Sequence, residues 1–122
     1  MYLGENIEDS EGKSYPMAGV LSCRSSMKGS RLTLGYRKVR ALDDNLLMST
    51  GESVRGHEFH LSALKEEPGN VAAYDVLDQA GRKEGFRVKN TLASYIHLHL
   101  GSKRSLAPSF VDFCAGWKAA TK

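Results

Sequence analysis

Alternating apolar and polar positions carry the main structural signal of this chain. Across residues 31–42, Leu32, Leu34 and Tyr36 alternate with polar residues, and the alternation changes phase near Lys38. Because successive side chains on a strand point to opposite faces, this pattern predicts a half-buried strand. The change of phase predicts a β-bulge in the second half of that strand.

Further segments repeat the strand signal. Residues 54–62 alternate in the same way, which places His57 and His60 on opposite faces of a predicted strand. Residues 71–78 and 84–88 flank a Gly-containing turn and predict a β-hairpin. We therefore expect the middle of the chain to consist of antiparallel strands.

Residues 89–101 set polar side chains into an apolar run. The β-branched, aromatic and aliphatic residues of this segment, with Asn90 before them and Gly101 after, predict one strand. Because side chains alternate along a strand, one face of this segment is expected to be apolar and the other to carry polar side chains that could take part in catalysis or binding. The second face is expected to hold Ala93, Tyr95, His97 and His99.

The two ends of the chain have helical periodicity. Leu3 and Ile7 lie one helical turn apart, with no helix-start signal before them, so residues 1–7 read as a helix already under way. Residues 107–118 predict an amphipathic helix with Pro108 in its first turn. Its apolar stripe, expected to dock on the rest of the fold with Cys114 in the core, consists of Phe110, Phe113, Cys114 and Trp117.

Size and charge narrow the class of protein. A chain of 122 residues fits a single domain, here taken as residues 1–122. Its net charge of +3 is small and dispersed, which argues against nucleic-acid binding. No apolar run is long enough for a membrane span or a signal peptide, so we expect a cytoplasmic protein with no membrane partner.

Four histidines in two close pairs are the candidate chemical groups: His57 with His60, and His97 with His99. One hypothesis is a metal site built from strand histidines. The ligand set is incomplete, because no carboxylate or cysteine cluster accompanies them, and we assign no metal ligand. A second hypothesis makes His97 a general base. Neither Cys23 nor a core Cys114 has the electropositive setting of an activated thiol, so its nucleophile is missing.

Several linked motifs resemble one known family. They are Tyr-Pro-Met-Ala-Gly-Val at 15–20, Leu-Gly-Tyr-Arg at 34–37, Arg-Gly-His-Glu-Phe-His-Leu-Ser at 55–62 and Asn-Thr-Leu-Ala-Ser-Tyr-Ile-His-Leu-His-Leu-Gly at 90–101. In this order and at these spacings they resemble the C-terminal glutamine amidotransferase domain of cobyrinic acid a,c-diamide synthases. The resemblance covers essentially the whole chain.

The resemblance implies an α/β fold, namely part of a class I, triad-type amidotransferase sandwich that is flavodoxin-like, with mostly antiparallel strands in this segment and a C-terminal amphipathic helix. It implies that a cysteine attacks the side-chain amide of glutamine, and it transfers the catalytic histidine of a Tyr-x-His motif to His97. The released ammonia would amidate acetate carboxylates of a tetrapyrrole. ATP and Mg²⁺ would belong to a separate synthetase domain, and this chain is expected to hold no cofactor of its own.

The chain departs from the family pattern at two places. The family's Cys-Gly-Gly nucleophile elbow directly precedes a Met-Tyr-Leu-Gly segment, and here that segment is residues 1–4. In many related enzymes a Glu two residues after the catalytic histidine orients it, and here that place is taken by His99. The residues expected to line the cleft or support His97 are His57, Glu58, His60, Tyr95 and His99.

Three functions therefore stay open at this stage. The chain is expected to be the C-terminal part of the amidotransferase domain, inactive alone and dependent on an N-terminal half that supplies the cysteine. The alternative is a non-catalytic module that binds a partner or itself through an open sheet edge and the terminal helix. The third is a metal-binding β protein.

Overall fold

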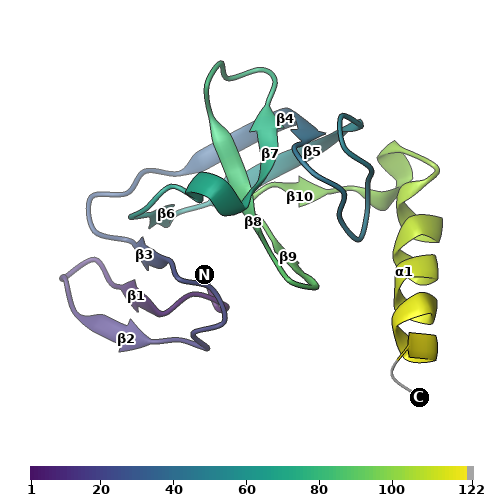
Figure 1. The fold of residues 1–122 in the computed structure, drawn as a ribbon. Coiled ribbons are helices and arrows are strands. Elements are labelled where there is room, and N and C mark those ends of the chain that lie inside the picture. The colour runs from purple at the N-terminus through teal and green to yellow at the C-terminus, as the bar shows by residue number, and fades with distance from the viewer. Residues whose placement is uncertain (121–122) are drawn as a thin grey trace.

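A curled six-stranded sheet forms the centre of the molecule, with a smaller sheet on one side and a helix on the other (Figure 1). The structure is a computed structural model, and it describes residues 1–120. The elements are β1 (Asn6–Glu8), β2 (Ser14–Pro16), β3 (Arg24–Ser26), β4 (Thr33–Ala41), β5 (Ser53–His60), β6 (Ala63–Leu64), the 3₁₀ turn η1 (Gly69–Val71), β7 (Ala72–Val76), β8 (Lys83–Val88), β9 (Thr91–Ala93), β10 (His97–Leu98), the 3₁₀ turn η2 (Leu100–Ser102) and α1 (Leu106–Ala120).

The six-stranded sheet has the order β10-β5-β4-β7-β8-β9, and every pairing in it is antiparallel. The smaller sheet, β2-β1-β3-β6, contains a parallel β1–β3 pair. Strands β9 and β10 are neighbours in sequence, yet they form the two opposite edges of the six-stranded sheet. The sheet is therefore curled, because the short segment between β9 and β10 connects its two edges. The prediction of an α/β segment with mostly antiparallel strands and a C-terminal helix is confirmed.

The main hydrophobic core is formed by buried residues of the six-stranded sheet, of the segments next to it and of the start of α1. Val39 and Tyr74 are almost completely buried there, and Leu106 at the start of α1 closes one end. A second, smaller cluster around Leu21, Cys23 and Phe86 joins the small sheet to β8. Together these clusters anchor the strands that carry the polar groups described below.

The predicted bulge in the first long strand is wrong. β4 pairs with β5 without interruption from Thr33 to Arg40, and inward and outward side chains alternate along its whole length. The apparent change of phase arises because Leu34 and Tyr36 point outward, where they are 65% and 88% exposed, on the same face as Lys38. The predicted hairpin of β7 and β8 is confirmed.

The predicted helix at residues 1–7 is also wrong. A single turn, in which the Gly4 amide donates to the Met1 carbonyl at 3.0 Å, leads directly into β1. The Glu5 amide then donates to the Cys23 carbonyl at 2.8 Å, so this segment takes its hydrogen bonds from a neighbouring strand region. The spacing of Leu3 and Ile7 is compatible with a strand as well, since residues an even number of positions apart share a strand face.

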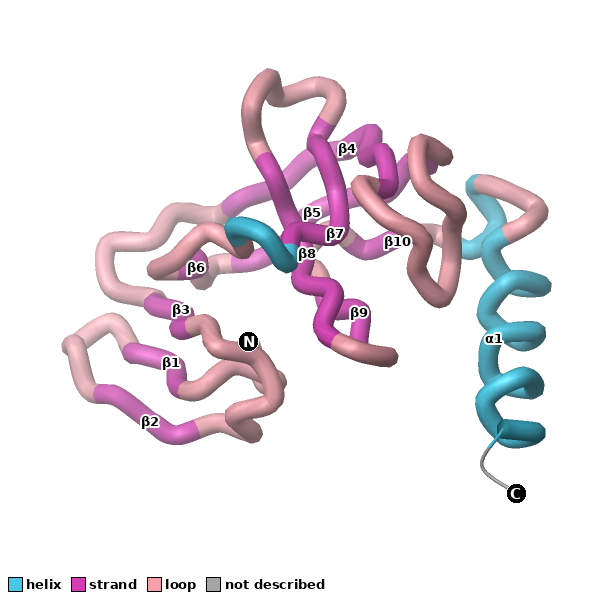
Figure 2. Tube along the Cα trace, viewed as in Figure 1, coloured by secondary structure: helices cyan, strands magenta, loops and turns pink. Residues whose placement is uncertain are grey.

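Residues 89–101 do not form one strand. The chain bends at 94–96 between β9, which pairs with β8, and β10, which pairs with β5 (Figure 2). The bend turns Tyr95 toward the interior, whereas His97 lies on the outer face of the sheet. The prediction that these two residues share a face is therefore wrong.

The C-terminal helix is confirmed, but its apolar stripe is not buried. Phe110, Phe113 and Trp117 are 44%, 39% and 57% exposed, and Cys114 is exposed where a core position was predicted. Only the first residue of α1, Leu106, is buried. No helix within residues 1–120 is long and apolar enough to cross a lipid bilayer.

Candidate functional site

The candidate residues fall on two faces of β5. Along this strand, Glu58 and His60 point to the interior, and His57 points outward. The prediction that His57 and His60 lie on opposite faces is confirmed. The candidate groups therefore form an inner cluster around Glu58 and an outer cluster around His97.

Glu58 is the centre of the inner cluster and is completely buried. Arg37 Nε donates to its Oε2 at 2.6 Å, and Arg82 donates to both carboxylate oxygens, at 3.1 Å from Nη1 and 2.5 Å from Nη2. Burial by itself raises the pKa of Glu58, but the hydrogen bonds and charge of Arg82, together with His60 and Arg37, lower it to about 2. Glu58 is thus an ionised and fully bonded anion at neutral pH.

His60 is held at both ring nitrogens. Its Nδ1 lies 2.7 Å from the Ser62 carbonyl oxygen, and its Nε2 lies 3.5 Å from Glu58 Oε1. One face of the ring stacks on Tyr95 with a centroid separation of 4.1 Å. Because both nitrogens face oxygen acceptors, His60 has no lone pair open toward a substrate.

Tyr95 links this cluster to the start of the chain. Its hydroxyl is 2.6 Å from Ser62 Oγ, and Ser62 Oγ is in turn 2.7 Å from the Met1 sulfur. The backbone amide of Tyr95 donates to Glu84 at 2.8 Å, and the Ser94 hydroxyl donates to the same carboxylate at 2.5 Å. These bonds fix the bend that separates β9 from β10.

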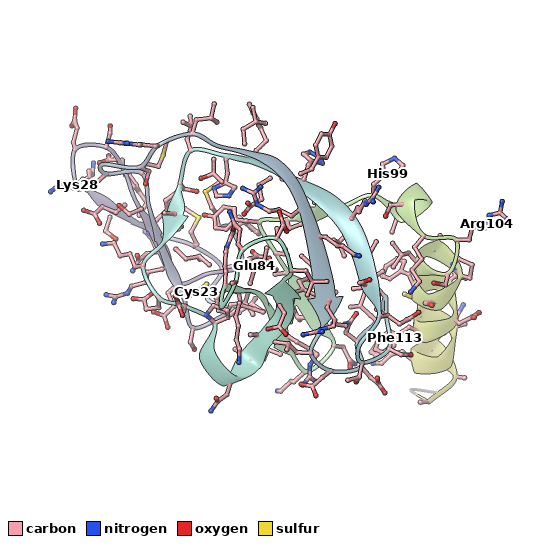
Figure 3. The ribbon with its side chains drawn as sticks, turned by 90° about the horizontal axis from the view of Figure 1, so that it is seen from above. Cys23, Lys28, Glu84, His99, Arg104 and Phe113 are labelled. Atoms are coloured by element: carbon pink, nitrogen blue, oxygen red, sulfur yellow. The ribbon has the colours of Figure 1, made fainter. Side chains whose placement is uncertain are left out.

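Glu84 is the second buried carboxylate of the interior, and Figure 3 places it centrally between the strands. Burial raises its pKa, against the lowering effect of the hydrogen bonds from Ser94 and Tyr95. Glu84 and Tyr95 lie between two cavities of about 650 Å³ and 370 Å³ and line both. Arg37, His60 and Arg82 also line the larger one.

The outer cluster is built by the ladder between β5 and β10, in which His57 lies opposite His97. The two imidazole rings stack with their centroids 4.9 Å apart. His97 Nδ1 is 3.2 Å from the backbone carbonyl oxygen of His57. A carbonyl only accepts, so Nδ1 carries the hydrogen and the neutral ring keeps the lone pair of Nε2 free on an exposed side chain.

Gly56 allows the two strands to approach this closely. A Cβ atom at this position would lie 2.6 Å from the His97 carbonyl oxygen and 2.9 Å from Ile96 Cγ2. Any larger residue would push β10 away from β5. The place of His97 therefore depends on a glycine on the neighbouring strand.

His99 ends the strand and caps the turn that follows. Its Nδ1 accepts a hydrogen bond from the Gly101 amide at 3.1 Å, at the start of η2. Within residues 1–120 no carboxylate bonds to His97, and Glu58 lies on the opposite face of β5. The group that orients the His97 imidazole in this structure is the backbone carbonyl of His57.

Other candidate chemistries find less support in the geometry. Burial raises the pKa of the Cys23 thiol, which agrees with the prediction that Cys23 is not an activated nucleophile. Within the part of the chain that the structure describes, no three His, Cys, Asp or Glu side chains gather closely enough to hold a metal ion. Sequence reasoning missed Arg37, Arg82 and Glu84, because a charged residue in a strand or turn gives no signal of burial.

Comparison with known proteins identifies the family. The sequence model of the CobB/CobQ-like glutamine amidotransferase domain matches residues 1–105. The chain belongs to this family. All the candidate residues, from His57 to His99, lie within the matched region.

The similar curated proteins carry consistent names. A cobyrinate a,c-diamide synthase of Dehalococcoides mccartyi strain CBDB1 is 41% identical over 124 residues, which cover 93% of this chain. One from Salmonella typhimurium strain LT2 is 42% identical over 108 residues and 84% of the chain, and a hydrogenobyrinate a,c-diamide synthase of Streptomyces coelicolor is 38% identical over 99 residues and 81% of the chain. The chain spans 27%, 23% and 20% of the lengths of these three relatives. The predicted amidotransferase family is confirmed.

Proposed function

We propose that this chain is the histidine-bearing part of a glutamine amidotransferase that serves an a,c-diamide synthase in corrinoid biosynthesis. One observation carries the proposal: within the region matched to the amidotransferase family, His97 is held at Nδ1 by a backbone carbonyl and keeps Nε2 free on an exposed ring. That is the tautomer required of a general base.

The proposed chemistry uses Nε2 of His97 as a base and as an acid in turn. It takes the proton of a cysteine thiol contributed by the remainder of the enzyme, and the thiolate attacks the Cδ carbonyl carbon of glutamine. The imidazolium then returns the proton to the leaving nitrogen, which departs as ammonia and leaves a thioester. Water, deprotonated by the same nitrogen, hydrolyses the thioester to glutamate and regenerates the thiol.

The remaining parts of the reaction belong outside this chain. We propose that a synthetase domain uses ATP and Mg²⁺ to activate tetrapyrrole carboxylates, which the ammonia then amidates, and that the chain alone is inactive for want of the cysteine. The names of the relatives support this substrate class. A cytoplasmic location is part of the same proposal.

Complementation tests this proposal. The 122-residue chain is mixed with a polypeptide comprising the first three quarters of the Dehalococcoides mccartyi relative, and ammonia release from glutamine is measured. We expect release from the mixture and from neither component alone. His97→Ala should lower the rate about 100-fold or more, because general base catalysis contributes at least that much, while His57→Gln should have a far smaller effect. Equal rates for wild type and His97→Ala would contradict the assignment.

A second function has one observation in its favour. The outer face of β4 and β5 exposes Leu34 and Phe59, which lie directly opposite each other in the ladder and are 65% and 62% exposed. Exposed apolar surface of this kind marks interaction sites, so a non-catalytic module that binds a partner or itself is the alternative. Light scattering that detects a stable dimer, together with no ammonia release in the complementation assay, would favour this alternative.

A further inference from the structure

The outer face of β4, β5 and β10 is ordered in rows across the strands. Leu34 and Phe59 form an apolar row. In the next row, His57 lies between its ladder partners Tyr36 on β4 and His97 on β10. One step further along the strands, the same ladder pairs Lys38 with Arg55, and His99 follows His97 by two residues. The face therefore changes from apolar, through imidazole and phenol rings, to cationic.

Arg55 differs from most arginines of this molecule. Five others are paired with carboxylates: Arg24, Arg37, Arg40, Arg82 and Arg87. Within residues 1–120, the guanidinium of the exposed Arg55 has neither a hydrogen bond nor an ion pair, while its backbone belongs to the β4–β5 ladder and its carbonyl also accepts from Ser102 Oγ at 3.1 Å.

Arg55 lines an open cavity of about 570 Å³. The walls come from β4, from β5 and from the segment that follows β10, and they consist of Tyr36, Arg55, Gly56, His57, His99 and Ser102. No acidic residue lines this cavity. An uncompensated guanidinium in such a place favours a carboxylate, which it binds through two parallel hydrogen bonds.

We propose that Arg55 binds the α-carboxylate of the glutamine whose side-chain amide reacts beside His97. This inference rests on the proposed function and names the residue that would select its substrate. Arg55 is a diagonal neighbour of His97 on the outer face of β5 and β10, and the Cα atoms of such a pair are about 7–8 Å apart. Four carbon–carbon bonds separate the amide carbon of glutamine from its carboxylate carbon, about 5 Å when extended. With a hydrogen bond at each end, one glutamine matches the spacing of these two strand positions, and the flexible Arg55 side chain can adjust its reach.

The arrangement predicts a specific kind of selectivity. An amide without the α-carboxylate leaves the Arg55 guanidinium unpaired, and asparagine is one methylene too short to reach both groups. The preference for glutamine over 4-aminobutanamide, which has the amine and the amide but no carboxylate, should therefore depend on Arg55.

Binding to the 122-residue chain measures this preference without any catalysis. Histidine ring signals in NMR spectra are followed while L-glutamine or 4-aminobutanamide is added. We expect glutamine to bind about tenfold more tightly than 4-aminobutanamide, as a charged hydrogen-bonded pair contributes that much. Arg55→Gln should abolish the difference, and Arg55→Lys should restore part of it. Arg104→Gln is the matched control, because Arg104 also lacks a partner within residues 1–120 and points away from the body of the molecule (Figure 3).

Each outcome decides the inference. Equal binding of glutamine to the wild type and to Arg55→Gln, an equal loss in Arg104→Gln, or no binding of glutamine to the wild-type chain would each overturn it. In the complementation assay Arg55→Gln should raise KM for glutamine about tenfold and change kcat little. Arg55-dependent binding without ammonia release would refute the proposed function and leave the binding site standing. Ammonia release with an unchanged KM in Arg55→Gln would refute this inference alone.

Discussion

The two faces of β5 both carry titratable side chains, but those on the inner face are buried or half-buried and hydrogen-bonded, whereas those on the outer face are exposed. On the inner face, Glu58 is completely buried and bonds to Arg37 and Arg82. On the outer face, one residue away along the strand, His57 and its ladder partner His97 are exposed. The inner groups have used their hydrogen-bonding capacity on each other, and the outer groups have not.

This difference separates stability from chemistry within one motif. A buried ion pair that loses one member leaves an uncompensated charge in the interior, so the inner cluster is sensitive to substitution. An exposed imidazole with a free nitrogen contributes little to folding and remains available for proton transfer. In the Arg-Gly-His-Glu-Phe-His motif at residues 55–60, alternate side chains thus point inward to stabilise the fold and outward to where they are available for chemistry.

Removal of the Glu58 charge should have the largest effect on stability. Glu58→Gln removes the buried carboxylate that neutralises the half-buried Arg37 and Arg82, and we expect a loss of about 3 kcal/mol in the free energy of unfolding. Urea denaturation measures it. Glu66→Gln is the control, because it breaks an exposed pair with Arg24 and should cost less than about 1 kcal/mol. Similar losses in the two variants would erase the distinction between the faces.

Acid should weaken the fold through the same carboxylate. The pKa of Glu58 is lowered to about 2 in the folded chain, below the ordinary value of 4.5. Between these values the unfolded chain binds more protons, so Glu58 contributes stability above about pH 4.5 that is lost as the pH falls toward 2. Unfolding measured across this range should have a shallower pH dependence in Glu58→Gln than in the wild type. An unchanged slope would mean that Glu58 is not ionised inside the fold.

The two faces of β4 offer a matched test with apolar residues. Val39→Ala removes two buried methyl groups and should cost about 2 kcal/mol. Leu34→Ala changes a side chain that is 65% exposed and should cost less than about 1 kcal/mol, even though it removes the larger volume. If Leu34→Ala proved the more destabilising of the two, the outer face would be packed against something, as in a dimer.

Substitution of Glu84 should have the smallest effect on stability, and its pH dependence should have the opposite sign to that of Glu58. Burial raises its pKa above the ordinary value of 4.5, so the ionised form weakens the folded state. This penalty is absent below about pH 4.5 and grows as the pH rises from there to the folded pKa. Glu84→Gln keeps the shape and removes the penalty. We expect its stability relative to the wild type to improve as the pH rises from about 4.5 to the folded pKa of Glu84, and to level off above that pKa. A relative stability that worsens with rising pH would contradict this.

Local patterns were sufficient for the elements whose hydrogen bonds are local. The hairpin of β7 and β8 and the opposite faces of His57 and His60 follow from alternation and turn residues, and both were predicted from the sequence. The family followed from the order of the linked motifs. The hairpin and the strand faces depend on neighbours close in sequence, whereas the family depends on the order of motifs from residue 15 to residue 101.

Distant contacts set the features that the sequence did not reveal. β9 and β10 read as one strand, but their ladder partners lie at opposite edges of the sheet, and the bend between them is fixed by Glu84. The start of the chain has a helix-like spacing, but its backbone pairs with the region around Cys23. Arg82 looks like an ordinary turn residue until the fold brings it to Glu58, 24 positions earlier.

The position of His97 can be disturbed by a substitution at Gly56, on the neighbouring strand. A Cβ atom at this position collides with the backbone of β10 and with Ile96, which is buried. A single added methyl group would therefore displace an imidazole that it never touches. Loss of activity from a substitution at residue 56 would then be a failure of alignment between two strands, with every reacting group still in the chain.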